Sequence, residues 1–403
     1  MTSAVDLVLN SLERFAPLEG ARVGFLIDRW SPDRGGAEAA LQSLAGRLSD
    51  LGARLVIFSN HADLEQLPPN SEWQRVKGSG VFRRQREASL AKELVRAARD
   101  ANCDVTIGTR HLPDVDLYWP HGGCYAVAWQ ARRLSRGRRA QNHPRGRHKL
   151  FLNLERILCE ESGARRVICV SELVEDELRE AYPACADRLK TIHNGVDLQR
   201  FHPGERLSED GAGAMLRAEL GLHAESKLVL FSAREPQLKG LPNLLSALAS
   251  SVAVHTHLLI AGVRRPSRWK RMVRELGLSD RTSFIPDGDP VALSAAADLC
   301  VLPTWRDACS LVVLECLASG TPVITTRRNG AFRVITDAIA GTILSDPSDV
   351  DAMRQAIHEH LRPSEGSDLD RRNQVRETVL ALSHVDWLDA LATEVAELIR
   401  LKS

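Results

Sequence analysis

Residues 302–326 read LPTWRDACSLVVLECLASGTPVITT, and the order of the apolar runs in this stretch predicts how the second half of the chain folds. One apolar run ends at Pro303, and another begins at Leu311. Gly320 is typical of a helix end, and Pro322 is typical of the opening of an extended segment. A buried strand, an apolar helix and a second strand in this order predict a parallel α/β arrangement.

The same alternation of strands and helices continues on both sides of this stretch. A polar, glycine-containing region at 194–213 is the best linker candidate, and a chain of 403 residues is long enough for two domains. We therefore predict two Rossmann-like domains in tandem, with final helices near Asp368–Leu382 and Asp386–Leu401. The expected strands are Val23–Ile27, Leu55–Phe58, Val105–Gly108, Val167–Val170, Leu228–Phe231, Leu258–Ala261, Thr282–Ile285, Leu299–Leu302, Val323–Thr325 and Thr342–Leu344.

Composition narrows the classes of protein to which the chain can belong. A net charge of +1 argues against a protein that attracts polyanions through its overall field, so we expect no nucleic-acid partner. No apolar stretch reaches the roughly 18 residues of a transmembrane helix, and residues 1–14 lack the pattern of a signal peptide. The eight cysteines include no CxxC pair, which favours buried, reduced thiols. We therefore expect a cytoplasmic location.

Two cations follow the predicted strand Leu228–Phe231, namely Arg234 and Lys239. Because ligands of open α/β sheets bind at the carboxyl ends of strands, this pair could neutralise a diphosphate. Solvated surface cations are the alternative interpretation. Gly35 and Gly36 follow the first strand and precede a helix, whose free N–H groups suit a phosphate. A plain strand-to-helix turn explains the two glycines equally well.

Two carboxylates flank the start of the apolar helix in residues 302–326. Asp307 follows the strand, and Glu315 lies inside the helix among leucine and valine residues. A charge in such surroundings requires a partner. That partner is either a structural cation elsewhere in the fold or a ligand, such as the hydroxyl pair of a ribose.

The spacing of Asp307 and Glu315 resembles the E-x7-E motif of retaining GT-B glycosyltransferases of family four, with Asp in place of the first Glu. The Gly-Gly turn, the Arg234/Lys239 pair and the stretch TIHNGVD at 191–197 also occur where that family has them. The resemblance covers nearly the whole chain, which looks most like the lipopolysaccharide-core glucosyltransferases. It implies a GT-B fold with two Rossmann-like domains facing a central cleft. The acceptor-binding domain would span 1–195 and the nucleotide-sugar-binding domain 205–385, while a last helix at about 386–403 would pack back on the first domain.

The resemblance also implies roles for individual residues. Arg234 and Lys239 would stabilise the leaving diphosphate, helped by backbone N–H groups at the helix start. Glu315 would hold the ribose, and Asp307 the hydroxyls of the donor sugar. His121, in the stretch WPHGG, would lie near the reacting sugar, although a loop histidine that bonds the backbone is the plain alternative. The donor-binding set implied in this way is Gly35, Gly36, Phe284, Ile285, Ser310, Leu311 and Glu315.

The activity implied by the resemblance is transfer of a hexose, with glucose from UDP-glucose expected, to a saccharide or glycolipid acceptor in cell-envelope glycan synthesis. Three departures from the family pattern, at Ala233, Asp307 and Ser310, put the donor sugar in doubt. They also keep open a non-catalytic nucleotide-sugar-binding protein, and a sugar-nucleotide epimerase of the same fold is a further alternative.

Two D-x-D sequences, Asp114-Val-Asp116 and Asp349-Val-Asp351, have the form that other glycosyltransferases use for Mg²⁺ or Mn²⁺. Neither follows the expected strand context, so we expect no metal and no cofactor.

A basic stretch extends from Arg132 to Lys149 without an acidic residue. Anionic lipid headgroups attract such a segment, and a phosphorylated glycolipid acceptor would do so as well. A nucleic-acid-binding patch or a plain mobile loop is the alternative. We expect peripheral contact with the inner face of the cytoplasmic membrane through Arg132, Arg133, Arg136, Arg138 and Arg139.

Overall fold

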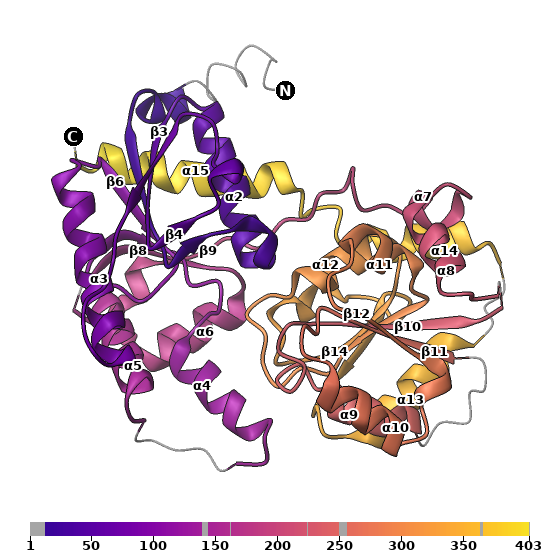
Figure 1. Cartoon of the computed structure of the whole chain (residues 1–403). Coiled ribbons are helices and arrows are strands. Elements are labelled where there is room, and N and C mark those ends of the chain that lie inside the picture. Colours follow the sequence, from indigo (N-terminus) through magenta and orange to yellow (C-terminus); the bar gives the residue numbers. More distant parts are fainter. Residues whose placement is uncertain are drawn as a thin grey trace. The chain divides into compact units, whose positions relative to one another are not determined.

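The computed structural model describes residues 13–138, 144–161, 163–223, 225–249, 256–362 and 366–402 (Figure 1). Its contacts divide the chain into two compact units. Unit 1 comprises Met1–Trp129, Gln141–His193 and Val385–Ser403, and unit 2 comprises Gln130–Ala140 and Asn194–His384. Unit 2 therefore includes residues 130–140 and the predicted linker at 194–213. The two units are discontinuous in the sequence, so the single domain boundary expected between residues 195 and 205 does not describe them.

Unit 1 is built on a seven-stranded sheet in which all neighbouring strands are parallel. In spatial order the strands are β5 (Ser71–Arg75), β3 (Arg54–Ser59), β1 (Arg22–Leu26), β6 (Val105–Gly108), β7 (Val115–Tyr118), β8 (Ala164–Cys169) and β9 (Leu189–Thr191). Its main helices are α2 (Gly36–Asp50), α3 (Arg83–Asp100), α5 (Arg147–Cys159), α6 (Glu172–Ala181) and α15 (His384–Arg400), and α4 (Tyr125–Leu134) begins in unit 1 and ends in unit 2. The last helix is tied to α2 by an ion pair of 2.7 Å between Asp389 and Arg47.

Unit 2 has a six-stranded parallel sheet. In spatial order its strands are β12 (Thr282–Ile285), β11 (Thr256–Ala261), β10 (Lys227–Ser232), β13 (Leu299–Leu302), β14 (Val323–Thr326) and β15 (Gly341–Leu344). One face is covered by α9 (Leu241–Ala249), α10 (Ser267–Glu275) and α13 (Val350–Leu361) (Figure 1). The other face is covered by α8 (Ala212–Glu219), α11 (Pro290–Ala296), α12 (Leu311–Ala318) and α14 (Asp368–Glu377).

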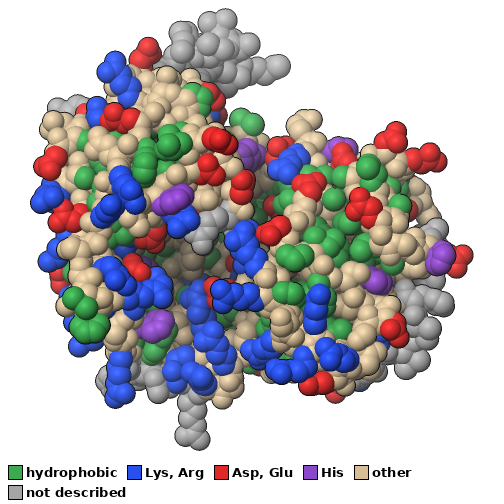
Figure 2. Space-filling model, viewed as in Figure 1, with side chains coloured by type: hydrophobic (Ala, Val, Ile, Leu, Met, Phe, Trp, Pro, Cys, Tyr) green, Lys and Arg blue, Asp and Glu red, His purple; other side chains and the backbone are tan. Residues whose placement is uncertain are grey.

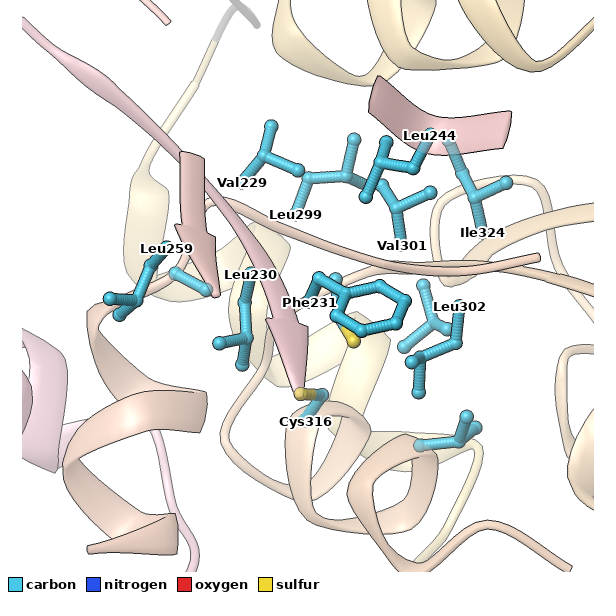
Figure 3. Packing of buried hydrophobic residues seen from close by; sticks show 14 of the residues in the cluster. Val229, Leu230, Phe231, Leu244, Leu259, Leu299, Val301, Leu302, Cys316 and Ile324 are labelled. Atoms are coloured by element: carbon cyan, nitrogen blue, oxygen red, sulfur yellow. The ribbon is translucent and has the colours of Figure 1, made fainter. Parts of the chain in front are cut away.

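The core of unit 2 consists of the strands themselves and the apolar faces of its helices. Phe231 of β10 is fully buried, and it lies among side chains of β13, β14 and α12 in the close view of Figure 3. Because a doubly covered parallel sheet hides both faces of each strand, its strands read as continuous apolar runs. All six strands of this sheet are among those that the sequence predicted.

Three strands of the seven-stranded sheet escaped prediction: two polar edge strands and one short buried strand. β5 reads SEWQR and lies at one edge of the sheet, and β9 reads LKT and lies at the other. β7 reads VDLY, and its buried Asp116 accepts hydrogen bonds of 2.8 Å from both the amide and the hydroxyl of Thr106. Pattern analysis misses the two edge strands because they are polar, and it misses β7 because a buried aspartate interrupts its short apolar run.

The described part of the chain contains no helix that is long and apolar enough to cross a bilayer.

We predict that Phe231→Ala lowers the free energy of unfolding of unit 2 by about 3–5 kcal/mol, because it removes a fully buried ring and leaves a cavity. Phe231→Leu keeps most of the apolar contact and costs less than the alanine variant. Urea denaturation followed by far-UV circular dichroism measures both. A loss below about 1 kcal/mol in the alanine variant would show that this core repacks freely.

Candidate functional site

The strand order of unit 2 reverses between β10 and β13, which places a topological switch point at the carboxyl ends of these strands. Such a point is the usual ligand site of an open α/β sheet. Arg234 and Lys239 follow β10, whereas Asp307 and the start of α12 follow β13. The predicted cations and carboxylates therefore come from the two loops that diverge at one place in the fold.

Lys239 and Asp307 form an ion pair of 2.5 Å, with 19% and 16% of their side chains exposed. The Lys239 ammonium also lies 3.4 Å from the Arg306 carbonyl oxygen. The next residue, Gly240, has a φ of +82°, and a Cβ added there would lie 2.1 Å from the Pro303 carbonyl oxygen. Only glycine lets the β10 loop approach the β13 loop so closely. The structure thus brings together two of the residues predicted to be catalytic.

Asn329 fixes the loop that carries Asp307, and the sequence analysis did not single it out. Its side-chain oxygen accepts hydrogen bonds from the amides of Ser310 (3.2 Å) and Ala331 (3.1 Å). Its side-chain nitrogen donates to the Thr325 hydroxyl at 3.0 Å. In this ligand-free structure the Ser310 N–H is therefore bonded to Asn329, and its expected role in binding the donor stays a prediction. Ser310 also places no side-chain cap on the first turn of α12, which begins at Leu311.

Glu315 lies on α12 without a counter-ion. In the part of the chain that the structure describes, its carboxyl group makes neither an ion pair nor a hydrogen bond. Burial among apolar side chains raises the pKa of Glu315 to about 7, an effect that Arg200 opposes and Asp289 reinforces. Arg200 itself pairs with Asp289 at 3.1 Å. Of the two partners considered from the sequence, a structural cation is absent here, and a ligand hydroxyl pair remains.

A pocket of about 290 Å³ lies at the carboxyl ends of β10 and β11 and is lined by Arg234. Other residues that line it are Arg264, Arg265 and Trp269. Figure 2 shows Lys and Arg side chains gathered over this side of unit 2, near α9 and α10. Three guanidinium groups around one pocket favour a polyanionic ligand.

Phe284 and Ile285, expected near a nucleotide base, end β12 at the same edge of the sheet. The Ile285 carbonyl oxygen accepts a hydrogen bond of 3.0 Å from the Gly262 amide, so it is already engaged. The Lys270 ammonium lies 5.6 Å from the centre of the Phe284 ring.

Arg132 proves to be engaged in unit 2 instead of being a free member of the basic stretch. Its guanidinium donates two hydrogen bonds of 2.9 Å to the two carboxylate oxygens of Glu235, the residue after Arg234. These bonds from Arg132 lower the pKa of the Glu235 carboxyl. Gln237, in the same loop, donates to the Ser135 carbonyl oxygen. Residues 132–135 thus hold the β10 loop that carries both predicted cations.

The remaining members of the basic stretch differ in exposure. Arg136 and Arg138 are exposed, and Arg133 is half-buried. Leu134 beside them is 40% exposed. Arg139 lies outside the described residues.

In unit 1, Gly35 and Gly36 lie where α2 begins. Gly35 is the residue before the helix and has extended backbone, so its geometry is open to any residue. No side chain caps this end of α2 in the described structure. The two glycines follow β1 at the carboxyl edge of the sheet, which agrees with a phosphate-binding turn and equally with a plain connection.

His121 follows β7 at the same edge of the unit 1 sheet. Its ring packs on Trp119 with centroids 4.0 Å apart, and its buried Nε2 has no hydrogen-bond partner among the described residues. Burial lowers the pKa of His121 to about 3, so the ring is neutral at physiological pH. The neutral ring can form a hydrogen bond with a ligand hydroxyl, but it cannot act as an imidazolium acid.

The D-x-D sequences serve structural contacts. Asp114 pairs with Arg99 at 2.5 Å, and Asp116 pairs with Lys402 at 2.8 Å. Asp349 caps α13 by accepting from the Ala352 amide. The described residues contain no group of three or more His, Cys, Asp or Glu side chains that could hold a metal ion.

Two family models match consecutive parts of the chain. The model for glycosyltransferase family 4 matches residues 34–200, and the model for glycosyl transferases group 1 matches residues 215–378. The chain belongs to the GT-B glycosyltransferases. The first match begins after β1 of the unit 1 sheet, whereas the second contains all six strands of the unit 2 sheet together with Arg234, Lys239, Asp307 and Glu315.

Similar proteins agree with this assignment. The glycosyltransferase is 28% identical to D-inositol 3-phosphate glycosyltransferase 2 of Catenulispora acidiphila over 378 residues, covering 85% of this chain and 86% of that protein. It is 24% identical to the lipopolysaccharide glucosyltransferase WaaG of Escherichia coli over 269 residues, covering 65% and 69% of the two chains.

Solved structures share the fold. A WaaG crystal structure superposes with a TM-score of 0.78 at 20% identity, covering 92% of this chain and 98% of that one. The Anabaena protein HepE in complex with UDP-glucose superposes with a TM-score of 0.70 at 18% identity, covering 93% and 99%.

We predict that Glu315→Gln changes the pH dependence of stability in the ligand-free glycosyltransferase. The pKa of Glu315 is raised from 4.5 to about 7 in the folded chain, so the folded state holds its proton more tightly than the unfolded state in this window. Stability due to this group therefore falls as the pH rises from about 4.5 to about 7. The glutamine variant lacks this loss. The melting temperature of the variant minus that of the wild type should therefore increase as the pH rises from about 4.5 to about 7. If differential scanning fluorimetry finds the same difference at both pH values, the raised pKa of Glu315 is contradicted.

We predict that Arg132→Ala weakens donor binding about fivefold, because the loop of Arg234 and Lys239 loses a bidentate ion pair of about 1 kcal/mol. Calorimetric titration with the donor measures the change. Arg136→Ala is the matched control, because it removes an exposed arginine from the same segment. Equal losses in both variants would show that overall charge, not the Glu235 contact, matters.

Proposed function

We propose that this glycosyltransferase moves glucose from UDP-glucose, with retention of configuration and without a metal ion, to a saccharide or lipid-linked saccharide in cell-envelope glycan synthesis. The observation that carries the proposal is the Lys239–Asp307 ion pair at the switch point of unit 2. One cation and one carboxylate meet where a nucleotide ligand of this fold is expected, and they come from different strands.

Lys239 and Arg234 supply positive charge for the diphosphate of the donor. As the glycosidic bond breaks, negative charge grows on the leaving diphosphate, so its attraction to these cations is stronger in the transition state than in the ground state. In the ligand-free protein, Asp307 neutralises Lys239. Once the Lys239 ammonium pairs with a diphosphate, the Asp307 carboxylate is available to accept hydrogen bonds from the hydroxyls of the donor sugar.

Glu315 supplies the second carboxylate. It has no counter-ion among the described residues, and its proton is held by burial alone. Two ribose hydroxyls donating to it would stabilise the ionised form and provide the partner that the apolar helix lacks. Binding of a nucleotide should therefore lower the pKa of Glu315 and release a proton near neutral pH.

His121 supplies a neutral hydrogen-bonding group on the unit 1 side. Because burial keeps its pKa at about 3, it would orient a sugar hydroxyl and not transfer a proton as an imidazolium. His121 would thus position the sugar. The sugar hydroxyl would provide a hydrogen-bond partner for the buried Nε2 of His121, which has none among the described residues.

Relatives support the choice of donor and acceptor. WaaG is named as a lipopolysaccharide glucosyltransferase, and HepE was crystallised with UDP-glucose. The D-inositol 3-phosphate glycosyltransferases favour a second acceptor class, a phosphorylated polyol, because the match to one of them spans 85% of this chain. Arg136 and Arg138 are exposed beside Leu134 and would attract the phosphate of either acceptor or an anionic membrane surface.

A thermal-shift panel of nucleotide sugars with and without EDTA tests the proposal. We expect UDP-glucose to stabilise the wild type, EDTA to change nothing, and Lys239→Ala to abolish the shift, since a lost charge-assisted bond costs about 1.5–3 kcal/mol. Lys227→Ala is the matched control, because Lys227 begins β10 at the opposite end of the strand. A shift that persists in Lys239→Ala, or disappears with EDTA, would contradict the proposed site.

Product analysis then separates the alternatives. Transfer of radiolabelled glucose to an acceptor extract supports the transferase. Conversion of the donor to an epimer would support the epimerase, and binding without any turnover would support a non-catalytic protein.

A further inference from the structure

A segment of unit 1 exposes apolar and basic side chains together. Val81 is 80% exposed and Phe82 is 69% exposed, and the two are consecutive. They lie between β5 and α3 in a stretch, residues 75–86, that contains five basic residues and no acidic one. We call this stretch the 75–86 segment. Its basic residues are all exposed, and they are Arg75, Lys77, Arg83, Arg84 and Arg86.

The exposure of Val81 and Phe82 is built into the local structure. The amides of both residues donate to the Gln85 side-chain oxygen at 3.1 Å and 3.0 Å. The Ser79 amide donates to the Ser89 hydroxyl at 3.1 Å. A Cβ added at Gly78 would lie 2.2 Å from the Arg86 carbonyl oxygen, so the loop lies tightly against α3. The backbone is held on the helix while the two apolar side chains face solvent.

The positive charge of the segment is not neutralised nearby. Glu87 is the closest following acid, but Arg110 and Arg147 contact it at 3.3 Å and 3.2 Å. Arg83 approaches Glu87 only to 3.8 Å, with 70% of its side chain exposed. Arg84 and Arg86 make no ion pair with any residue that the structure describes. The segment therefore keeps cations available for an external anionic partner.

The segment lies at the ligand edge of the unit 1 sheet. It follows the carboxyl end of β5, and all strands of that sheet are parallel. β5 is separated from β1 by β3 alone, so its end lies about 10 Å from the β1 loop that leads to Gly35. A partner held by the 75–86 segment would thus lie beside the edge where the acceptor domain binds its ligand.

We propose that the 75–86 segment anchors the glycosyltransferase to an anionic lipid surface. Val81 and Phe82 enter the interface, and the surrounding arginines contact phosphate headgroups. A bilayer surface fits this pair of features because its interface accepts apolar side chains while its headgroups attract cations. The anchor rests on the proposed function, since it explains how a lipid-linked acceptor is reached. The segment belongs to unit 1, whereas Arg136 and Arg138 belong to unit 2.

Cosedimentation of the full chain with vesicles tests the anchor. Vesicles of phosphatidylcholine are compared with vesicles of phosphatidylcholine and phosphatidylglycerol in equal parts. We expect the wild type to bind the mixed vesicles only. The double variant Val81→Ser/Phe82→Ser should lower the partition coefficient at least about tenfold. Arg84→Gln/Arg86→Gln should lower it about fivefold for each charge removed.

Two matched controls accompany these variants. Leu64→Ser removes a 59% exposed leucine that lies between two acidic residues of unit 1, and it should bind like the wild type. Arg136→Gln/Arg138→Gln removes charge from the other basic stretch, and it should retain most of the binding. The melting temperature and the shift caused by UDP-glucose should be unchanged in Val81→Ser/Phe82→Ser, which shows that the variant is folded.

Three results would overturn the anchor: equal binding of the wild type to both vesicle types, unchanged binding of Val81→Ser/Phe82→Ser, or a dimer in sedimentation velocity that this variant dissolves. The last result would mean that Val81 and Phe82 contact a second copy of the chain. Failure of the wild type to respond to UDP-glucose would count against the donor site, whereas the vesicle results would still decide the anchor.

Discussion

The ion pair between Lys239 and Asp307 is the constraint on which the candidate site of unit 2 depends. It joins two loops that leave neighbouring strands in opposite directions, and it can form only because Gly240 permits their close approach. A cation and a carboxylate held together in a partly buried place orient each other until a ligand competes for them. In the proposed function, that ligand is the diphosphate of the donor.

Supporting contacts hold each side of this pair in place. On the β13 side, Asn329 ties the loop of Asp307 to the start of α12, where the amide of Ser310 is already bonded. On the β10 side, Glu235 accepts a bidentate contact from Arg132, so part of the basic stretch holds the β10 loop. Glu315 is the exception, because it has no counter-ion among the described residues and burial raises the pKa of its carboxyl group to about 7. An unpaired group in an otherwise satisfied site is where a ligand contact is most useful.

Unit 1 differs from unit 2 in the chemistry that it presents at its ligand edge. Unit 2 offers charges, whereas unit 1 offers a neutral imidazole at His121 and an uncapped helix start at Gly36. The 75–86 segment adds exposed apolar and basic side chains at one end of the same edge. A donor unit that neutralises phosphate and an acceptor unit that meets sugar hydroxyls and a lipid surface would divide the work of transfer between the two sheets.

The amino-acid sequence by itself determined the two parallel sheets of this protein, because strands buried on both faces must be continuous apolar runs. Family motifs in the sequence also identified Lys239, Asp307 and Glu315. The tertiary structure alone decided how these residues are used: that Lys239 pairs with Asp307, that Asn329 occupies the Ser310 amide, and that Arg132 belongs to the donor loop. It also decided that the polar strand β5 and the short strand β7, which contains Asp116, join the sheet, and that Val81 and Phe82 face solvent. The physical reason is that the hydrophobic periodicity of a segment reflects only its local environment. An ion pair or a side-chain hydrogen bond can join residues far apart in the chain, and whether they meet depends on the order of the strands.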